Sequence, residues 1–358
     1  MRRSHIATIL LTCFFSLTAR SPSFVFAQQP PQASEKERGV ELYRKGDFNE
    51  AVKALREALK KQASDSDAWY YLGLSLHRAG KVEDARKAFE KTVSLRRDFA
   101  PGYAAMAYMQ LLVNDNKRAI ENAEKALALD PKNLDSLYIA GTARLREGAG
   151  AEALARAEEA LKVKPDHPQA LILKTQALLN MFAKWPAKAG AKTDQREDDK
   201  PSDDAAGEAK RRSHYSLLKS ASESLEAYLK LGAENSDQDS LDSLREQLEE
   251  LRFYARRADD AGSNDSEAPM TAALRPTILY RERAHYTDAA LDARVRGTII
   301  LMVVFADDGV LKHILVIQGL SHGLTEEAVK AARKIRFTPA MRDGKPISVF
   351  GRLEFTFN

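Results

Sequence analysis

The sequence predicts two modules, an all-α superhelix of repeated helix pairs followed by a small α+β domain of order α-β-β-α-β. Three observations lead to this fold class. Small and apolar residues recur every 34 residues over much of the first half of the chain, which is typical of stacked helix pairs. A polar stretch, Asp259 to Met270, then reads as a linker. Beyond it, a β-branched run and an alternating final strand replace the helical pattern.

The first element is a predicted signal peptide, residues 1–27. Arg2 and Arg3 precede a short apolar run, and an A-x-A-like cleavage site ends at Ala27. We expect cleavage there and export to the periplasm. The alternative is an uncleaved anchor in the inner membrane, although the apolar run is short for a bilayer span. The single cysteine, Cys13, lies in this segment, so cleavage excludes thiol chemistry from the mature chain.

Helix pairs are predicted over residues 35–182. Trp69, Tyr103 and Leu137 are spaced by 34 residues, and Pro131 and Pro165 end successive repeats at one phase. Small residues at one position of the first helix let it approach the second, and glycines fall at the turn between them. The turn glycines are Gly46, Gly80 and Gly148.

This pattern resembles the tetratricopeptide repeat family over about Glu35 to His167, four full repeats. The residues that carry the resemblance are Trp69, Leu72, Gly73, Ala85, Phe89 and Pro131. The third repeat departs at Asn114, where glycine is usual. In this family the first helix of each pair lines a concave groove that binds a peptide or a helix. By phase, the groove residues are Tyr70, Leu74, His77, Arg78, Tyr108, Leu111, Tyr138, Leu145 and Arg146. The alternative is that some of these residues form the core between repeats and do not contact a ligand.

A fifth repeat begins at Pro168 and is interrupted. Residues 183–211 are polar and mixed in charge, which predicts a disordered insertion. Residues 212–258 are expected to complete the repeat and add a capping helix with an apolar leucine stripe. A linker is expected over residues 259–272.

The last module is predicted over residues 273–358. Its helix at Thr287 to Val295 leads into a doubly buried strand, Gly297 to Phe305. A turn at Gly309 and a second strand follow, then a helix beginning near Leu324. The closing stretch alternates, with Val349, Leu353, Phe355 and Phe357 on one face and polar residues on the other.

The stretch from Tyr286 to Phe357 resembles the C-terminal domain of TonB, the energy transducer of Gram-negative envelopes. It matches at Tyr286, Gly297, Asp308, Gly309, Phe337, Pro339, Ala340, Gly344 and Pro346. It departs at Thr287, where proline is usual. The resemblance implies that a receptor segment adds a strand to the sheet alongside the final strand. It also suggests a part in TonB-dependent transmembrane transport.

We therefore predict a non-enzymatic envelope scaffold with protein partners at both modules and no cofactor. The strand-docking residues are Phe350, Arg352, Glu354 and Thr356. Ordinary solubilising roles are the alternative for each of them. A second hypothesis is a membrane-anchored transducer coupled to a proton-driven motor complex, although the proline-rich spacer of that family is missing here. The seven histidines show no metal-ligand spacing, and a Ser216-x-x-Lys219 match lacks companion motifs. The near-balanced charge, formally +4, is not typical of a nucleic-acid-binding protein.

Overall fold

In a computed structural model of the chain, the structure describes residues 34–184, 205–232, 238–256, 267–269 and 274–358. The predicted signal peptide, with its cleavage site, lies outside these residues, as do most of the insertion and most of the linker. Within the described part, none of the helices combines the length and apolar character that crossing a membrane requires.

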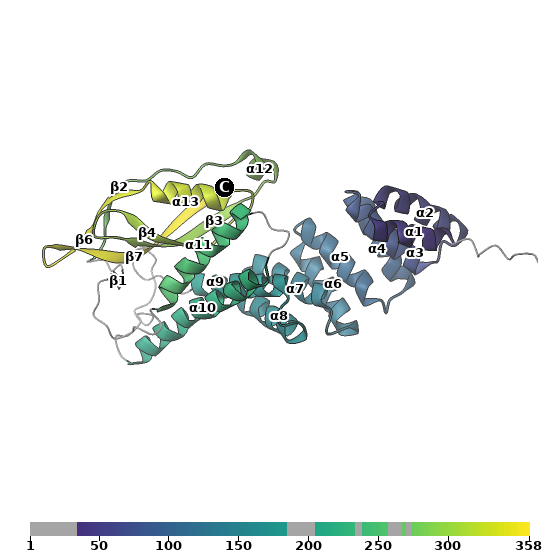
Figure 1. Ribbon diagram of the computed structural model, residues 1–358, viewed down its shortest axis with the longest axis horizontal. Coiled ribbons are helices and arrows are strands. Elements are labelled where there is room, and N and C mark those ends of the chain that lie inside the picture. The colour runs from purple at the N-terminus through teal and green to yellow at the C-terminus, as the bar shows by residue number, and fades with distance from the viewer. Residues whose placement is uncertain (1–33, 185–204, 233–237, 257–266, 270–273) are drawn as a thin grey trace, which may run out of the picture.

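The repeat rod is a row of antiparallel helix pairs that runs from one end of the molecule to its middle (Figure 1). Its helices are α1 (Glu35–Lys45), α2 (Phe48–Lys61), α3 (Ser66–Arg78), α4 (Val82–Leu95), α5 (Ala100–Leu112), α6 (Asn116–Leu129), α7 (Leu134–Arg146), α8 (Gly150–Val163), α9 (Pro168–Ala183) and α10 (Ala205–Lys230). The last pair, α9 and α10, flanks the insertion. Helix α10 begins seven residues earlier than predicted, so the expected bounds of the insertion, 183–211, are too wide.

Small residues let the two helices of a pair approach closely. A Cβ atom added to Gly73 would lie 2.5 Å from a ring carbon of Phe89, and one on Gly39 would lie 2.5 Å from Leu55 Cγ. Real Cβ atoms do not come this close to carbon. The third pair has Ala107 where the second has Gly73, and there Ala123 replaces the bulky phenylalanine. The size of the residue on one helix of a pair is thus matched to the size of the residue that it faces on the other helix.

Replacing Gly73 with alanine is expected to destabilise the rod by about 1–3 kcal/mol, because the new methyl group overpacks against the fully buried Phe89 ring. Urea unfolding measures this change. In a double-mutant cycle, Phe89→Leu should relieve most of the cost, since the two sites share one contact. Equal costs of Gly73→Ala in both backgrounds would rule out this clash as the cause.

Turns between the helices of a pair use left-handed backbone. Gly46, Gly80 and Gly148 have φ of 88°, 76° and 78°, and Asn114 takes the same place in the third repeat with φ 59°. Asparagine is the side chain that best tolerates this conformation after glycine. The departure from the family pattern at Asn114 therefore preserves the turn.

The C-terminal domain contains a main sheet with strand order β1-β7-β3-β4. Its strands and helices are β1 (Glu267–Pro269), β2 (Thr277–Tyr280), α12 (Asp288–Asp292), β3 (Gly297–Phe305), β4 (Leu311–Gln318), α13 (Leu324–Arg333), β5 (Arg336–Thr338), β6 (Ala340–Arg342) and β7 (Lys345–Phe357). β2 and β5 form a separate two-stranded sheet, and β6 pairs with the start of β7. β1, β2, β5 and β6 were not predicted, and the leading helix is shorter than expected.

Motif residues of this domain hold its turns and corners. Phe337 packs edge-on against Phe305, with ring centroids 4.9 Å apart, and Tyr286 donates a hydrogen bond to Val295 O at 3.0 Å. Pro339 separates β5 from β6. Asp343 and Gly344 have φ of 51° and 73°, which is the hairpin turn that matches strand twist. Gly309 (φ 78°) and Gly297 (φ 148°) likewise adopt backbone that other residues rarely reach.

Each face of the main sheet packs against a buried core. On one face, α13 and the apolar side chains of β3 and β7 form a core that includes Leu301, Val303 and Phe355. On the other face, Ile300, Val304 and Leu315 pack into the core of the repeat end. The doubly buried character predicted for β3 is thereby confirmed, and its second face belongs to the rod.

Helix α11 (Gln238–Ala255) joins the two modules. It was predicted as a cap for the last repeat, and it packs on α10 and also crosses the sheet (Figure 1). The Tyr254 hydroxyl donates to His313 O at 2.6 Å, and Gln247 Nε2 donates to Val316 O at 2.7 Å. His313 stacks on Phe253 with centroids 3.5 Å apart. The rod and the sheet therefore share one buried core instead of being separated by a spacer.

One buried histidine makes the rod end sensitive to pH. His214 on α10 stacks on Phe182 with centroids 4.1 Å apart, and burial lowers its pKa from 6.5 to about 4. The unfolded chain therefore binds a proton at higher pH than the folded chain does. The stability contributed by the neutral ring is complete above pH 6.5 and is lost as pH falls towards 4.

We expect the free energy of unfolding to fall by about 2–3 kcal/mol more in the wild type than in His214→Phe between pH 7 and pH 4.5. Urea unfolding at the two pH values measures the difference. Glu250, whose pKa is raised by burial, is present in both proteins and cancels. Parallel pH dependences would contradict the assignment.

Candidate strand-docking edge and repeat groove

Strand β7 is paired with a neighbouring strand along most of one edge but only along a short part of the other. It pairs with β3 from Val349 to Phe357. On the opposite edge β1 runs parallel to it and pairs with residues 348–350. Among the described residues, no strand pairs with residues 351–357 on that side. This open edge is a row of backbone groups that another strand can use.

Two hydrogen bonds identify which residues face the open edge. In a strand, the N–H and C=O of one residue point to the same side and those of the next residue to the opposite side. The Glu354 carbonyl accepts from Arg281, outside the sheet ladder. Thr298, opposite Thr356, uses its carbonyl to accept from Gln318 on β4, at 2.8 Å. The backbone groups of Arg352, Glu354 and Thr356 therefore face outward.

The predicted docking side chains divide into two groups. Glu354 is half exposed and pairs with Arg352 at 2.8 Å, and the Thr356 hydroxyl lies 3.2 Å from that of Thr298. Phe350 is 8% exposed and packs against Tyr254 of α11. The prediction that Phe350 lies on an accessible surface was wrong, because the repeat end covers this part of β7.

Arg352 lies where the two modules meet. Its guanidinium donates to Ala183 O, at the C-terminal end of α9, at 2.9 Å, and it also holds Glu354. The open edge therefore begins directly beside the last repeat.

Arg281 is a second group on the open edge. It follows β2, donates to Glu354 O, and places its guanidinium carbon 4.9 Å from the centre of the Phe355 ring. Sequence reasoning missed this residue, since nothing in the local pattern links it to a strand more than seventy residues later.

The first helices of the pairs lie side by side and carry the predicted groove residues. His77 on α3 meets Tyr108 on α5 edge-on, with centroids 5.4 Å apart, and Arg146 on α7 donates to Leu111 O at 2.7 Å. Exposed side chains in this row include Arg78, Tyr108 and Arg146, while Tyr70, Leu74, His77, Tyr138 and Leu145 are partly buried. Leu111 is 5% exposed and belongs to the core between repeats, so its predicted exposure to a ligand was wrong.

A basic cavity of about 510 Å³ opens at the N-terminal end of the row. Tyr70 lines it, and burial raises the pKa of this tyrosine to about 12. Lys36 and Arg96 also line it and are held by Asp65 and Asp67 at 2.8 Å and 3.0 Å. The sequence prediction missed both cations. Lys36 takes the place of Tyr70 in the preceding repeat, so the repeat phase could have suggested it. Arg96 lies in the loop after α4, where the phase gives no such signal. The full lining is Lys36, Val40, Arg44, Asp67, Tyr70, Tyr71, Arg96 and Phe99.

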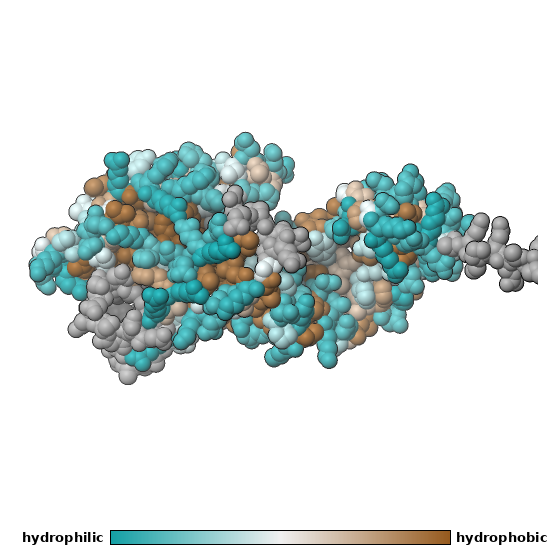
Figure 2. Space-filling model, in the orientation of Figure 1, coloured by the Kyte–Doolittle hydropathy of each residue, from teal (hydrophilic) through white to brown (hydrophobic). Residues whose placement is uncertain are grey.

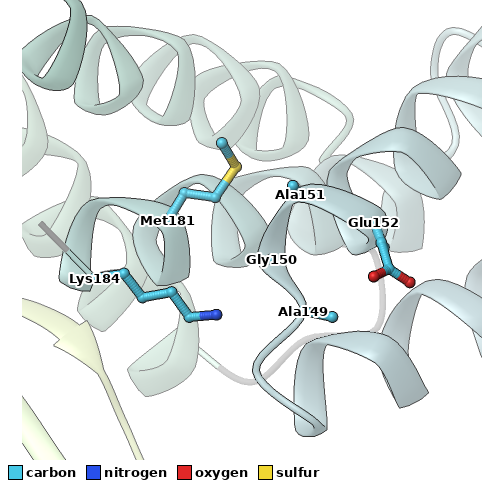
Figure 3. A pocket seen from close by; sticks show the side chains of 6 residues that line it. All are labelled: Ala149, Gly150, Ala151, Glu152, Met181 and Lys184. Carbon is cyan, nitrogen blue, oxygen red and sulfur yellow. The ribbon is translucent and has the colours of Figure 1, made fainter.

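A smaller cavity of about 280 Å³ lies between the start of α8 and the end of α9 (Figure 3). The Lys184 side chain extends across it towards the turn before α8 and donates to Gly148 O. Glu152 points away from Lys184 in this view and pairs with Arg144 at 2.7 Å. This arrangement ties the turn to α9 and leaves no convergent reactive groups.

The described residues contain no group of three or more His, Cys, Asp or Glu side chains that could hold a metal ion. His313 is engaged with Glu250, 3.1 Å from its Nδ1 atom. Ser216 donates its hydroxyl to Ser213 O at 2.6 Å, as helix serines commonly do. The surface in Figure 2 is mostly hydrophilic over the rod, with brown apolar patches on both modules.

Comparison with protein families agrees with the two modules. Residues 36–104 and 105–170 match the model of the tetratricopeptide repeat, and residues 282–358 match that of the Gram-negative bacterial TonB protein C-terminal domain.

Curated relatives match less than a third of the chain. They include Hsp70-Hsp90 organizing protein 3 of Arabidopsis thaliana, 28% identical over 103 residues, and the Hsp70-Hsp90 organizing protein of Triticum aestivum, 25% identical over 103 residues. Each alignment covers 29% of this chain, and the chain spans less than a fifth, 18%, of each relative.

Among solved structures, the MamA protein superposes with a TM-score of 0.42 at 20% identity, over 57% of this chain and 96% of that one. A thermophilic TPR protein of Thermus thermophilus gives 0.41 at 16% identity, over 61% and 97%.

Proposed function

Because this chain joins tetratricopeptide repeats to a C-terminal domain of the Gram-negative TonB type, we propose that it is a non-enzymatic scaffold of the cell envelope that docks two proteins. The repeats hold one partner in their groove. The TonB-type domain binds an extended strand of an outer-membrane or periplasmic protein along β7.

The observation that carries the proposal is the open edge of β7. Arg352, Glu354 and Thr356 turn their backbone groups outward, so a strand of about seven residues can pair with residues 351–357. Main-chain hydrogen bonds supply the affinity. Exposed Glu354 and Thr356 side chains select among partners.

The groove supplies the second docking surface. Tyr108 and Leu112 are 37% and 45% exposed on α5, and His77 and Arg146 flank them. Aromatic and arginine side chains dominate the binding energy of many protein interfaces. A peptide or helix with apolar anchors and acidic residues fits this combination.

Photo-crosslinking in cells tests both surfaces at once. A benzophenone amino acid replaces Thr356, Tyr108 or, as a control on the outer side of the rod, exposed Lys60. We expect distinct crosslinked proteins at positions 356 and 108 and none at position 60. Absence of any crosslinked envelope protein at position 356 counts against strand docking, and absence at position 108 counts against groove binding.

We further propose that the chain is exported to the periplasm and takes part in TonB-dependent transport. N-terminal sequencing of the mature protein is expected to start at Gln28. A mature protein that retains Met1 would instead support an anchored transducer.

A further inference from the structure

The chain itself occupies part of the edge on which the proposed partner strand would dock. Glu267 to Pro269 form β1, which lies beside β7 (Figure 1) and pairs with residues 348–350 in parallel. Arg281 covers Glu354 O further along the same edge. β1 and Arg281 both precede residues 282–358, which match the model of the TonB C-terminal domain.

Both occupants use the same row of backbone groups. By the alternation that places Arg352, Glu354 and Thr356 outward, the outward groups nearer the start of β7 are those of Ser348 and Phe350. β1 pairs with the segment that contains these two residues, and Arg281 donates to the carbonyl of Glu354 further along the same row. A partner strand that pairs along the whole row must therefore displace both occupants.

We propose that β1 and Arg281 act as an internal competitor that keeps the β7 edge partly closed until a partner strand replaces them. This inference rests on the proposed strand docking. The occupant displaced is a segment of this chain, and the replacing ligand is an extended segment of a protein partner.

The strength of the contacts suits a competitor. β1 contributes three paired residues, whereas β3 pairs with β7 over nine positions. Arg281 is exposed, and among the described residues it contacts the carbonyl of Glu354 and the ring face of Phe355. A few hydrogen bonds at a sheet edge are weak enough to be exchanged for those of a partner strand, yet they change the fraction of molecules in which the edge is open. Removing β1 is expected to raise partner affinity about tenfold.

Four variants of the full chain test the competition, all in a Cys13→Ser background. The first replaces residues 267–269 with Gly-Ser-Gly, which keeps the length. The second, Arg281→Met, keeps the apolar stem without its donors, and Arg283→Met is its matched control. The fourth joins the Cα partners Glu267 and Ser348 by a disulfide, Glu267→Cys with Ser348→Cys, at a strand spacing that such a bond accepts.

The probe is the detergent-solubilised outer-membrane fraction, and the readout is how much of one protein, identified by mass spectrometry, each immobilised variant retains. We expect more retention by the Gly-Ser-Gly and Arg281→Met variants than by wild type and Arg283→Met. The oxidised disulfide variant should retain least and should recover on reduction. Equal retention of the same protein by all variants overturns the internal competition while leaving strand docking intact.

Hydrogen exchange supplies a readout that needs no partner. The backbone amides at positions 348 and 350 should exchange about tenfold faster in the Gly-Ser-Gly variant than in wild type, and more slowly in the oxidised disulfide variant than in its reduced form. If no variant retains any protein but exchange behaves in this way, the proposed docking fails and β1 still closes the edge. Unchanged exchange at both amides overturns the inference whatever the retention.

Discussion

Proline at position 354 is expected to weaken docking of a partner strand at least about tenfold while leaving the C-terminal domain folded. The Glu354 N–H faces the open edge and takes no part in the ladder with β3. Glu354→Pro therefore removes an outward donor and places a ring where a partner backbone would approach, and edge strands tolerate proline in this orientation. Retention of the crosslinked partner and circular dichroism measure the two effects.

Two further substitutions control for side-chain loss and misfolding. Glu354→Ala removes the same side chain but keeps the backbone donor, so we expect it to retain most of the partner. Phe355→Pro removes an N–H that faces β3 and should unfold the sheet, which marks the signature of global damage. If Glu354→Pro binds as well as Glu354→Ala does, backbone pairing at this edge is not the mode of docking.

Leu251→Ala is expected to cost about 2–5 kcal/mol and to loosen the junction between the rod and the sheet. Leu251 on α11 is fully buried in the core that α9 and α10 share with β3, β4 and β7. Truncation in such a site loses the transfer free energy and leaves a cavity. Calorimetry should show the shared unfolding transition shift and broaden, and amides of β4 should lose protection together with those of α10.

An exposed leucine provides the matched comparison. Leu291 on α12 is 54% exposed, so Leu291→Ala should change stability by less than about 0.5 kcal/mol. A similar loss at both positions would mean that α11 contributes little to the junction. Loss of protection confined to α10 would show that the sheet folds independently of the rod.

This junction bears on the proposed function because it sets the geometry between two docking surfaces. Arg352 lies on β7, the proposed docking strand, and donates a hydrogen bond to Ala183 O at the C-terminal end of α9. The core that α9, α10 and α11 share with the sheet therefore fixes the end of the rod against the proposed docking strand. A flexible spacer would let the two partners move independently, whereas this arrangement keeps the end of the rod in register with the sheet.

Much of the fold could be predicted from local pattern. The 34-residue period, the turn glycines and the order of strands and helix in the last module all depend on residues near one another in sequence. The strands that were missed are short, since β1, β5 and β6 each have three residues and β2 has four. Such segments carry too few residues to show an alternation, and they exist because a neighbouring strand offers backbone groups.

The candidate site divides along the same line. Arg352, Glu354 and Thr356 could be placed on one face of the final strand from alternation alone. Phe350 lies on the same face, so the same rule predicted that its side chain would be exposed. Its burial depends on α11, which precedes it by about a hundred residues in sequence, and so does the packing that holds His313 and Tyr254 together. Alternation assigns faces but does not say what covers them.

The sequence by itself determined the two modules, the turns within them and the strand that ends the chain, since each follows from periodicity and backbone preference over a few dozen residues. Only the tertiary structure decided that the rod and the sheet share a core, and that β1 and Arg281 lie on the edge of β7. Those contacts join segments tens of residues or more apart. Their free energy comes from burying faces against each other and satisfying exposed backbone groups, which no local pattern records.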